Sequence, residues 1–244
     1  MGPVLILLYG IVAYLIAMAS IAYAIGFVGN YWVPKSIDSG SVGPLGKALI
    51  VNVLLLGLFA IQHSSMARRG FKKALTAIVP EPIERSTYVL LSALILCLLY
   101  WQWRPITDEI WRVDGPIGST LLQAVYFIGW GIVLLSTFLV NHADLFGLKQ
   151  VSDHWLGKDA AEPEFKTPAL YKIVRHPIYL GFILAFWATP VMTLGHLLFA
   201  VGTTGYILIG IFLEERDLVT TFGESYETYR KRVSMLIPWP PRRP

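Results

Sequence analysis

Two charged groups stand at the ends of one long apolar stretch of the chain. Arg175 and His176 directly precede Pro177 at one end, and Glu214 and Glu215 are adjacent carboxylates at the other. Proline is favoured in the first turn of a helix, so the Arg-His pair is predicted to mark a helix entrance. The exposed N–H groups of a helix N-terminus, together with an arginine, suit a carboxylate or a phosphate. The pattern therefore indicates a binding site for an anionic group.

The two glutamates point to a positive charge nearby. Glu214 and Glu215 are predicted to close a helix, where the helix dipole is already negative, and two carboxylates beside a membrane are costly. Arg175, Arg216 or a bound cation could compensate them. S-adenosylmethionine carries a carboxylate, an ammonium and a sulfonium, which matches both ends of the stretch. The plainer alternative is a basic anchor at the membrane surface, with Tyr179 among the lipid headgroups.

The elements that position these residues are predicted to be membrane-spanning helices. The chain has 244 residues, of which 55% are hydrophobic and only 15% charged, whereas soluble proteins carry about 25% charged residues. Six apolar segments approach the roughly 20 residues that cross a bilayer. They are residues 4–28, 45–62, 87–101, 121–140, 178–194 and 197–213. The last two are short, so the expected fold is an all-α polytopic transmembrane helical bundle of five to six spans.

The basic residues predict how these spans are oriented. Sixteen of the twenty lysines and arginines fall in the loops that follow the second and fourth spans and in the C-terminal tail. By the positive-inside rule, these loops and both termini are cytoplasmic. The hairpin 178–213 then returns both of its ends to the cytoplasmic side, where the two charged groups should meet. Helical spans also favour a bacterial inner membrane, since outer-membrane proteins are usually barrels.

The C-terminal tail and the loop after the fourth span are predicted to complete the site. Apolar side chains recur at spacings of three and four residues from Asp217 onward, which is typical of an amphipathic helix. They are Leu218, Phe222, Tyr226, Tyr229 and Val233. We expect one domain over residues 1–244, with four spans in 1–140 and the cofactor-binding part in 141–244.

Several sequence blocks resemble a known group of enzymes. RHPIYLG, followed by EERDL and FGESYETYRKRV, is similar to the C-terminal region of integral-membrane S-adenosylmethionine-dependent methyltransferases. The blocks IQHSSMARRGFK, ERSTYVLLSALIL and NHADLFGLKQV resemble the methanethiol S-methyltransferase branch, which is similar to NnrU-like membrane proteins. The resemblance implies methyl transfer from S-adenosylmethionine to a small thiol, giving dimethyl sulfide from methanethiol.

The resemblance also implies which residues bind the cofactor. By position, the cofactor-binding segment corresponds to Tyr171, His176, Tyr179, Leu180 and Gly181. Glu214 and Glu215 match the acidic closing pair, and Tyr226 falls where the tail of the family covers the cofactor. The resembling group also includes isoprenylcysteine carboxyl methyltransferases. The chain departs from this branch in one place: it has Leu194-Gly195-His196 where an Asn-Pro turn is common. This departure weakens a prenylcysteine assignment more than it weakens methyl transfer.

A thiol acceptor reacts as its thiolate, so a group must take its proton. Four cytoplasmic residues are candidates: His63 after the second span, and His142, Asp144 and His154 after the fourth. Gln150 belongs to the same polar cluster and is assigned to cofactor binding. The alternatives are an interfacial histidine for His63 and a polar helix cap for the His142–Asp144 pair.

Other kinds of site and partner receive little support from the sequence. Cys97 is the single cysteine, which excludes a disulfide framework, and the histidine spacings match no standard zinc pattern. No metal, nucleic acid or obligate protein partner is expected. The expected partners are the lipid bilayer and a small thiol substrate. Two alternative functions stay open: methylation of a prenylcysteine carboxylate or lipid amine, and a non-catalytic membrane protein.

Overall fold

The computed structural model describes residues 2–159 and 165–238, and the chain divides into two compact units. The first unit comprises Met1–Asp108, Asn141–Ala161 and Thr193–His196. The second comprises Glu109–Val140, Glu162–Met192 and Leu197–Pro244. Two of the basic residues used for orientation, Arg242 and Arg243, lie outside the described residues.

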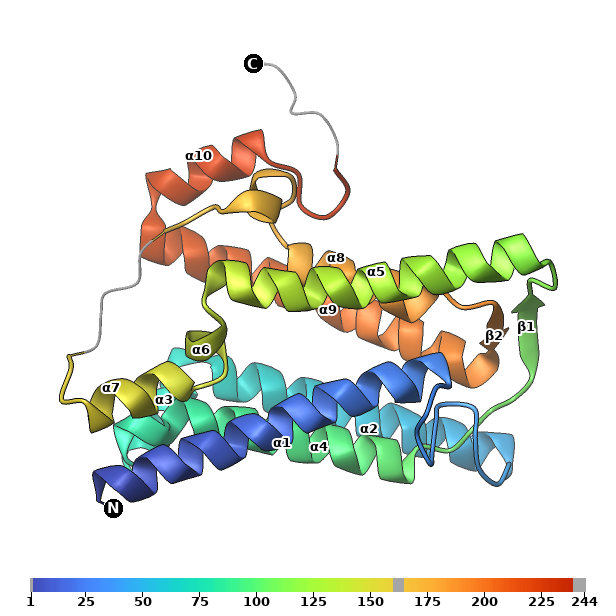
Figure 1. The fold of residues 1–244 in the computed structure, drawn as a ribbon, viewed down its shortest axis with the longest axis horizontal. Coiled ribbons are helices and arrows are strands. Elements are labelled where there is room, and N and C mark those ends of the chain that lie inside the picture. Colours follow the sequence, from blue (N-terminus) through green and yellow to red (C-terminus); the bar gives the residue numbers. More distant parts are fainter. Residues whose placement is uncertain (1, 160–164, 239–244) are drawn as a thin grey trace. The chain divides into compact units, whose positions relative to one another are not determined.

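Helices build the first unit (Figure 1). Its long helices are α1 (Pro3–Gly29), α2 (Leu45–Ala67) and α4 (Glu84–Gln102), and its short ones are α3 (Arg69–Thr76), α6 (His142–Leu145), α7 (Leu148–Trp155) and the 3-10 turn Glu81–Ile83. Helices α1 and α4 pack together, with the rings of Tyr23 and Tyr100 stacked at 5.2 Å. Asn52, fully buried in α2, bonds both the N–H and the carbonyl of Arg104 just after α4. This pair of bonds satisfies the amide and fixes α2 beside the end of α4.

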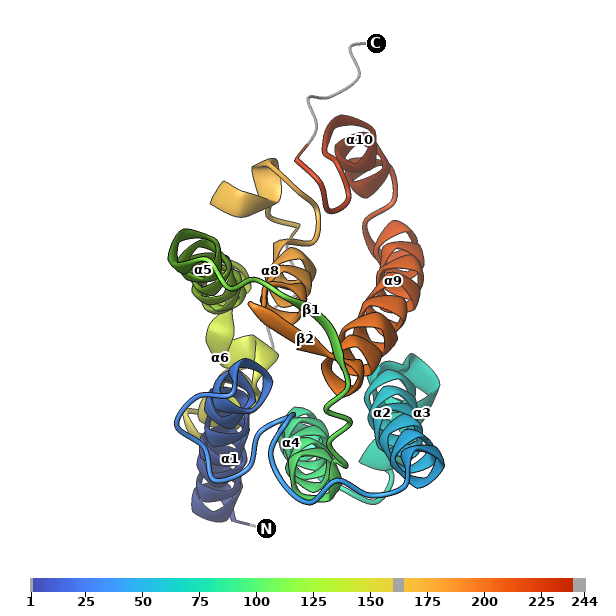
Figure 2. The ribbon, with the colours of Figure 1, turned by 90° about the vertical axis from the view of Figure 1, so that its right-hand side faces the viewer.

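In its described residues, the second unit is a set of helices with one small sheet. Its elements are β1 (Glu109–Arg112), α5 (Pro116–Val140), the 3-10 turn Ala169–Lys172, α8 (Pro177–Trp187), β2 (Val191–Thr193), α9 (Leu194–Phe222) and α10 (Glu224–Arg232). Strands β1 and β2 pair with each other. Figure 2 looks nearly along α5 and α8 and shows them as neighbours.

The contact between α5 and α8 depends on two glycines. A Cβ added to Gly181 would lie 2.6 Å from the carbonyl oxygen of Gly129, and one added to Gly129 would lie 2.7 Å from that of Gly181. Small residues let membrane helices approach this closely. Around this point, Trp130 of α5 meets the edges of Phe182 and Phe186 of α8. The start of α8 is therefore held firmly against α5.

Among the described residues, five helices are long and apolar enough to cross a membrane, which confirms the predicted all-α membrane architecture. They are α1, α2, α5, α9 and the helical stretch Glu81–Gln102. The predicted span 178–194 is wrong in its extent, because α8 ends at Trp187. The residues that follow are extended and include β2, and Ala188 and Met192 are buried. Buried, paired backbone is the form in which non-helical chain is tolerated at membrane depth.

The last span and the tail also differ from the prediction. Helix α9 has 29 residues and is not short; it begins at Leu194, inside the predicted turn, and continues to Phe222. The single amphipathic helix expected from Asp217 onward is interrupted at Gly223, whose φ of +53° favours glycine. Only Glu224–Arg232 forms the separate helix α10. Acidic residues in its first turn and basic residues in its last match the helix dipole.

Candidate functional site

The predicted meeting of the two charged groups is present in the second unit. Arg175 Nε lies 2.7 Å from Glu215 Oε1, and His176 Nε2 lies 3.0 Å from the same oxygen. The His176 side chain is 3% exposed and that of Glu215 13%. A carboxylate with so little solvent needs both donors, so these three residues form one buried, charge-assisted cluster.

The chain after α10 closes this cluster from the tail side. Arg175 Nη1 donates to the carbonyl oxygens of Arg230 and Val233, at 3.1 and 2.5 Å. The backbone N–H groups of Arg175 and His176 donate to the carbonyls of Ser234 and Met235, at 2.8 and 3.2 Å. The planar guanidinium therefore joins the entrance of α8, the end of α9 and the tail in one network.

Glu214 lies in a different environment from its neighbour. Its side chain is 44% exposed, and Oε2 accepts a hydrogen bond of 2.8 Å from the Tyr179 hydroxyl. Within the described ranges, the basic group nearest to it is His176, whose Nδ1 is 3.9 Å from Oε2. Glu214 thus keeps a carboxylate that remains accessible to a cationic ligand.

Three tyrosines surround the cluster from the loop before α8 and from α10. The Tyr229 hydroxyl donates to the carbonyl of Tyr171 at 2.5 Å. Burial, and then the charge of Glu214, raise the pKa of Tyr171. Burial also raises the pKa of Tyr229 to about 12, partly opposed by Arg175. All of these phenols are neutral at physiological pH and can act as hydrogen-bond donors.

Tyr226 is the most deeply buried of these tyrosines. It is 2% exposed, and its ring lies against Phe165 and Tyr229. Its hydroxyl is buried and has no hydrogen-bond partner among the described residues. Burial, and then the charge of Glu215, raise its pKa. An unpartnered buried hydroxyl costs free energy, which makes Tyr226 a candidate to bind a ligand.

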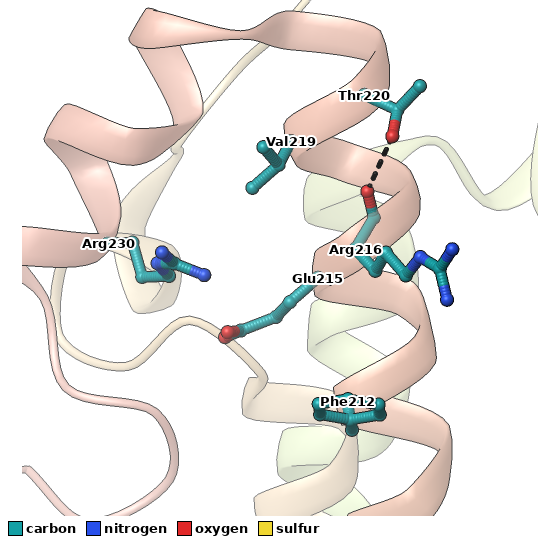
Figure 3. A pocket seen from close by; sticks show the side chains of 6 residues that line it. All are labelled: Phe212, Glu215, Arg216, Val219, Thr220 and Arg230. Carbon is teal, nitrogen blue, oxygen red and sulfur yellow. Dashed lines mark hydrogen bonds between the residues drawn. The ribbon is translucent and has the colours of Figure 1, made fainter.

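A cavity of about 310 Å³ lies beside the cluster, at the low end of the range for small-molecule sites. Its lining residues are Phe212, Glu215, Arg216, Val219, Thr220 and Arg230. Figure 3 shows Glu215 and Arg230 pointing toward one another from α9 and α10, while Arg216 points away. Thr220 donates to the carbonyl of Arg216, at 2.9 Å, so its hydroxyl is bound to its own helix. Glu215 is the acidic group that this cavity presents.

Two further predicted cofactor residues lie in the first turns of α8. Leu180 is partly buried, and its N–H donates to the carbonyl of His176 at 3.0 Å. Gly181 faces α5, where its missing Cβ admits the backbone of Gly129. The observed geometry therefore gives Gly181 a packing role, and a contact with the cofactor remains a prediction.

The proposed proton acceptors and Gln150 belong to the first unit. His63 lies near the end of α2, with Nε2 at 2.8 Å from the Tyr88 hydroxyl and Nδ1 at 3.1 Å from Ser92 Oγ. The Ser92 hydroxyl also lies 3.3 Å from Gln62 Oε1. His63 is thus part of a polar network enclosed by apolar helix surfaces.

The segment after α5 separates the remaining candidates. His142 Nε2 lies 3.0 Å from the Tyr14 hydroxyl of α1, and partial burial lowers the pKa of His142. Asp144 Oδ1 instead accepts a hydrogen bond of 2.7 Å from Gln150 Nε2. His154 is exposed near the end of α7. The His-Ala-Asp pattern therefore places its two titratable groups in different surroundings.

Sequence reasoning missed the groups that hold Arg175. The acceptors from residues 230, 233 and 234 are backbone carbonyls, which no side-chain pattern reveals. It also missed Phe165, whose ring contacts Phe222, Tyr226 and Tyr229. The three-residue spacing of Tyr226 and Tyr229 was the available signal that one face of the tail helix is aromatic.

Comparison with known proteins identifies relatives along almost the whole chain. The family model described as NnrU protein matches residues 51–227. The chain is 59% identical, over 95% of its length, to methanethiol S-methyltransferase 1 of Bradyrhizobium diazoefficiens, of which it covers 81%. It is 54% identical to methanethiol S-methyltransferase of Mycobacterium tuberculosis, with 98% of each chain covered. It is 33% identical, over 68% of its length, to Nurim of Xenopus laevis, of which it covers 61%. No solved structure matches the chain.

Proposed function

The chain belongs to the NnrU family, and we propose that it is a membrane methyltransferase that methylates methanethiol with S-adenosylmethionine. The observation that carries the proposal is the cluster of Arg175, His176, Tyr179, Glu214 and Glu215. It occurs in a chain at least 54% identical to two proteins named methanethiol S-methyltransferase. Those names support the methyl-transfer class and the thiol acceptor, and the cluster supports the donor.

The residues of the second unit suit S-adenosylmethionine. The Glu214 carboxylate is accessible and can accept N–H bonds from an ammonium. The buried Tyr226 hydroxyl has a free donor and acceptor in the described structure. Arg175 and His176 already bind Glu215, so we assign them to holding that carboxylate in place. Tyr171, Tyr179, Leu180 and Gly181 shape the surrounding wall, and Gln150 is retained as a further proposed contact.

When bound, S-adenosylmethionine supplies a methyl group that its sulfonium already activates. The protein must then place the acceptor sulfur in line with that methyl carbon and remove the thiol proton. Methyl transfer would form a carbon–sulfur bond to the acceptor and break the bond to the sulfonium, giving dimethyl sulfide and S-adenosylhomocysteine. The proton goes to a base, for which His63 and His142 are the leading candidates, ahead of Asp144 and His154.

The proposed location is the bacterial inner membrane with the site on the cytoplasmic side. The five apolar helices support a membrane location. Lysines and arginines are concentrated in the loops after the second and fourth spans and in the C-terminal tail, which supports a cytoplasmic position for these segments. A small apolar thiol can dissolve in the bilayer, which gives a reason for a membrane enzyme to use it.

The direct test incubates the purified protein with S-adenosylmethionine and methanethiol and measures dimethyl sulfide in the headspace. Calorimetry on the same sample measures cofactor binding. Cofactor binding without product would favour a prenylcysteine or lipid-amine acceptor. Absence of binding would favour a non-catalytic protein.

Variants test the site itself. Glu214→Gln keeps the shape but removes the charge, so cofactor affinity should fall by roughly 10- to 100-fold. His176→Ala should lower it as well, because Glu215 loses a donor. Glu224→Gln, an exposed carboxylate in α10, is the matched control and should bind normally. Normal binding by Glu214→Gln would remove this residue from the site.

The pH profile separates the candidate bases. His63→Asn should lower the turnover at neutral pH. The turnover of this variant should recover as the pH rises, because the thiol then ionises by itself. The same profile for His142→Asn, with His63 intact, would move the role to His142. A variant whose activity is low at every pH has lost something other than a proton acceptor.

A further inference from the structure

A second cavity lies within the first unit, and two of its lining residues, Asp144 and Gln150, also have proposed roles in methyl transfer. Its volume is about 270 Å³, and it is formed by α3, the start of α4, and the segment of α6 and α7. Its lining residues are two basic, two acidic and one amide side chain: Lys72, Arg85, Glu84, Asp144 and Gln150. Such a balanced set of charges differs from a simple anion site.

The local sequence builds this cavity by docking residues 141–147 on α4. The Asn141 side chain accepts from the N–H of Asp144 and starts α6. Gly147 has a φ of +83°, and a Cβ there would lie 2.7 Å from Ser86 Oγ. Arg85 Nε donates to the carbonyl of Leu145, at 3.0 Å. The glycine lets the segment approach closely, and the arginine fixes it there.

The opposite charges in the cavity do not pair directly. In the described part of the chain, neither Lys72 nor Glu84 has an ion-pair partner within 4.0 Å. Two oxygens, Glu84 Oε1 and Gln150 Oε1, are buried without any hydrogen-bond donor. Gln150 is oriented so that its Nε2 bonds Asp144, which leaves its oxygen as a free acceptor.

These groups specify the chemistry of a ligand. Two buried acceptors, one of them a carboxylate, suit a cation that carries N–H groups. Lys72 and the Arg85 guanidinium suit an anion, and phosphate is a common partner of both. A zwitterion with a primary ammonium and a phosphate matches both sets of groups.

The position of α3 favours a lipid as the source of this zwitterion. Helix α3 follows the apolar helix α2 almost directly and carries Arg69, Lys72 and Lys73. Phe71 is 42% exposed and Ile78, just beyond the helix, is 86% exposed. Basic helices with exposed apolar residues lie in the membrane interface, at the level of the lipid headgroups.

We propose that this cavity binds the headgroup of phosphatidylethanolamine. The phosphate lies between Lys72 and Arg85, and the primary ammonium donates to Glu84 Oε1 and Gln150 Oε1. A trimethylated ammonium has no N–H to donate, so phosphatidylcholine leaves both acceptors unsatisfied. The expected preference for the primary ammonium is about tenfold, as for hydrogen bonds to charged groups.

The test uses the full-length protein, purified in detergent and freed of lipid. Phosphatidylethanolamine, phosphatidylcholine and phosphatidylglycerol with identical acyl chains are titrated, and bound lipid is counted by native mass spectrometry. Phosphatidylethanolamine should bind about tenfold more tightly than phosphatidylcholine. Equal binding of the three lipids would overturn the proposal.

Variants locate the binding. Glu84→Gln removes the charge with little change of shape, and Lys72→Gln removes the charge that faces the phosphate. Each should reduce the preference for phosphatidylethanolamine, and two variants guard against one that fails to fold. Lys73→Gln, the exposed neighbour on the same helix, is the control and should retain the preference. Retention of the preference by both test variants would overturn the assignment.

Two further arms distinguish rival occupants. Displacement of the lipid by soluble phosphoethanolamine at comparable concentration would overturn the lipid as the source, because the acyl chains would then contribute nothing. S-adenosylmethionine also carries an ammonium and a carboxylate. If Glu84→Gln and Lys72→Gln weakened its binding and left lipid binding unchanged, the cavity would belong to the cofactor instead.

Discussion

The two units contain similar sets of charged residues, which pair directly in the second unit and, among the described residues, do not in the first. In the second unit, Arg175 and His176 bind Glu215 directly, and the arginine also holds the tail. In the first unit, Lys72 and Glu84 line one cavity without an ion-pair partner in the described ranges. The first arrangement is completed by the protein itself, and the second leaves donors and acceptors for a ligand. Stability should therefore depend more on Arg175, His176 and Glu215 than on Lys72 and Glu84, and lipid binding should depend on Lys72 and Glu84.

The largest expected effect comes from breaking the completed cluster. Arg175→Gln leaves the buried Glu215 carboxylate with only His176 and releases the carbonyls of the tail. Breaking a buried ion pair costs about 3–5 kcal/mol of unfolding free energy. Lys72→Gln should change it by less than about 0.5 kcal/mol, as at an ordinary surface position. Denaturant unfolding in lipid-free micelles measures both, and equal losses would erase the contrast between the two units.

A smaller effect is expected where backbone contacts position each region. Gly181→Ala places a Cβ 2.6 Å from the Gly129 carbonyl, so α8 must move from α5 at a cost of about 1–3 kcal/mol. Gly147→Ala should have a comparable cost in the first unit, since its φ is positive and Ser86 is close.

Gly131→Ala is the control for both, because a Cβ there meets nothing within 4 Å. Gly181→Ala should weaken the binding of S-adenosylmethionine, and Gly147→Ala that of phosphatidylethanolamine. If each variant instead impaired both ligands equally, the two regions would not be independent.

Hydropathy predicted most of the fold, because long apolar runs have few alternatives in a membrane. It failed at residues 188–193, where apolar composition does not distinguish a helix from buried extended chain. The meeting of Arg175 and His176 with the glutamates followed from topology alone. Which glutamate each would bind did not, since adjacent residues on a helix point in directions about 100° apart.

The cavity of the first unit could not be predicted from the sequence. Asp144 and Gln150 were predicted to act near the methyl acceptor and the cofactor, and that remains untested. Their mutual hydrogen bond depends on the turn at Gly147, and their proximity to Glu84 depends on the contact of that turn with Ser86. Contacts of this kind arise from packing between distant segments, which no local pattern encodes.

The hydroxyl groups of two tyrosines in α10 can also be compared. Tyr229 donates a hydrogen bond to the Tyr171 carbonyl, so Tyr229→Phe should cost about 1 kcal/mol of stability. Tyr226 has a buried hydroxyl with no partner in the described structure, so Tyr226→Phe should leave stability unchanged or raise it. Cofactor affinity should fall for Tyr226→Phe, measured by calorimetry beside thermal unfolding. A loss of stability without any loss of affinity would give this hydroxyl a structural role.

The smallest expected effects are those of pH on stability. Acid pH should destabilise the first unit, and alkaline pH the second. Burial lowers the pKa of His142 in the first unit, so its protonation favours the unfolded chain. Stability should fall as the pH drops below about 6.5, the ordinary value of histidine. Burial raises the pKa of Tyr229 in the second unit to about 12. Between pH 10 and that value only the unfolded chain loses this proton, so stability should fall as the pH rises.

Paired melting curves test this division. The difference in melting temperature between the parent protein and Tyr229→Phe should shrink above about pH 10, and that for His142→Asn should shrink below about pH 6.5. His142→Asn should leave the fall in melting temperature at alkaline pH unchanged, and Tyr229→Phe should leave the fall at acid pH unchanged, because each removes one titrating group. If His142→Asn altered the alkaline limb, or Tyr229→Phe the acid limb, then the titrations of the two units would be coupled.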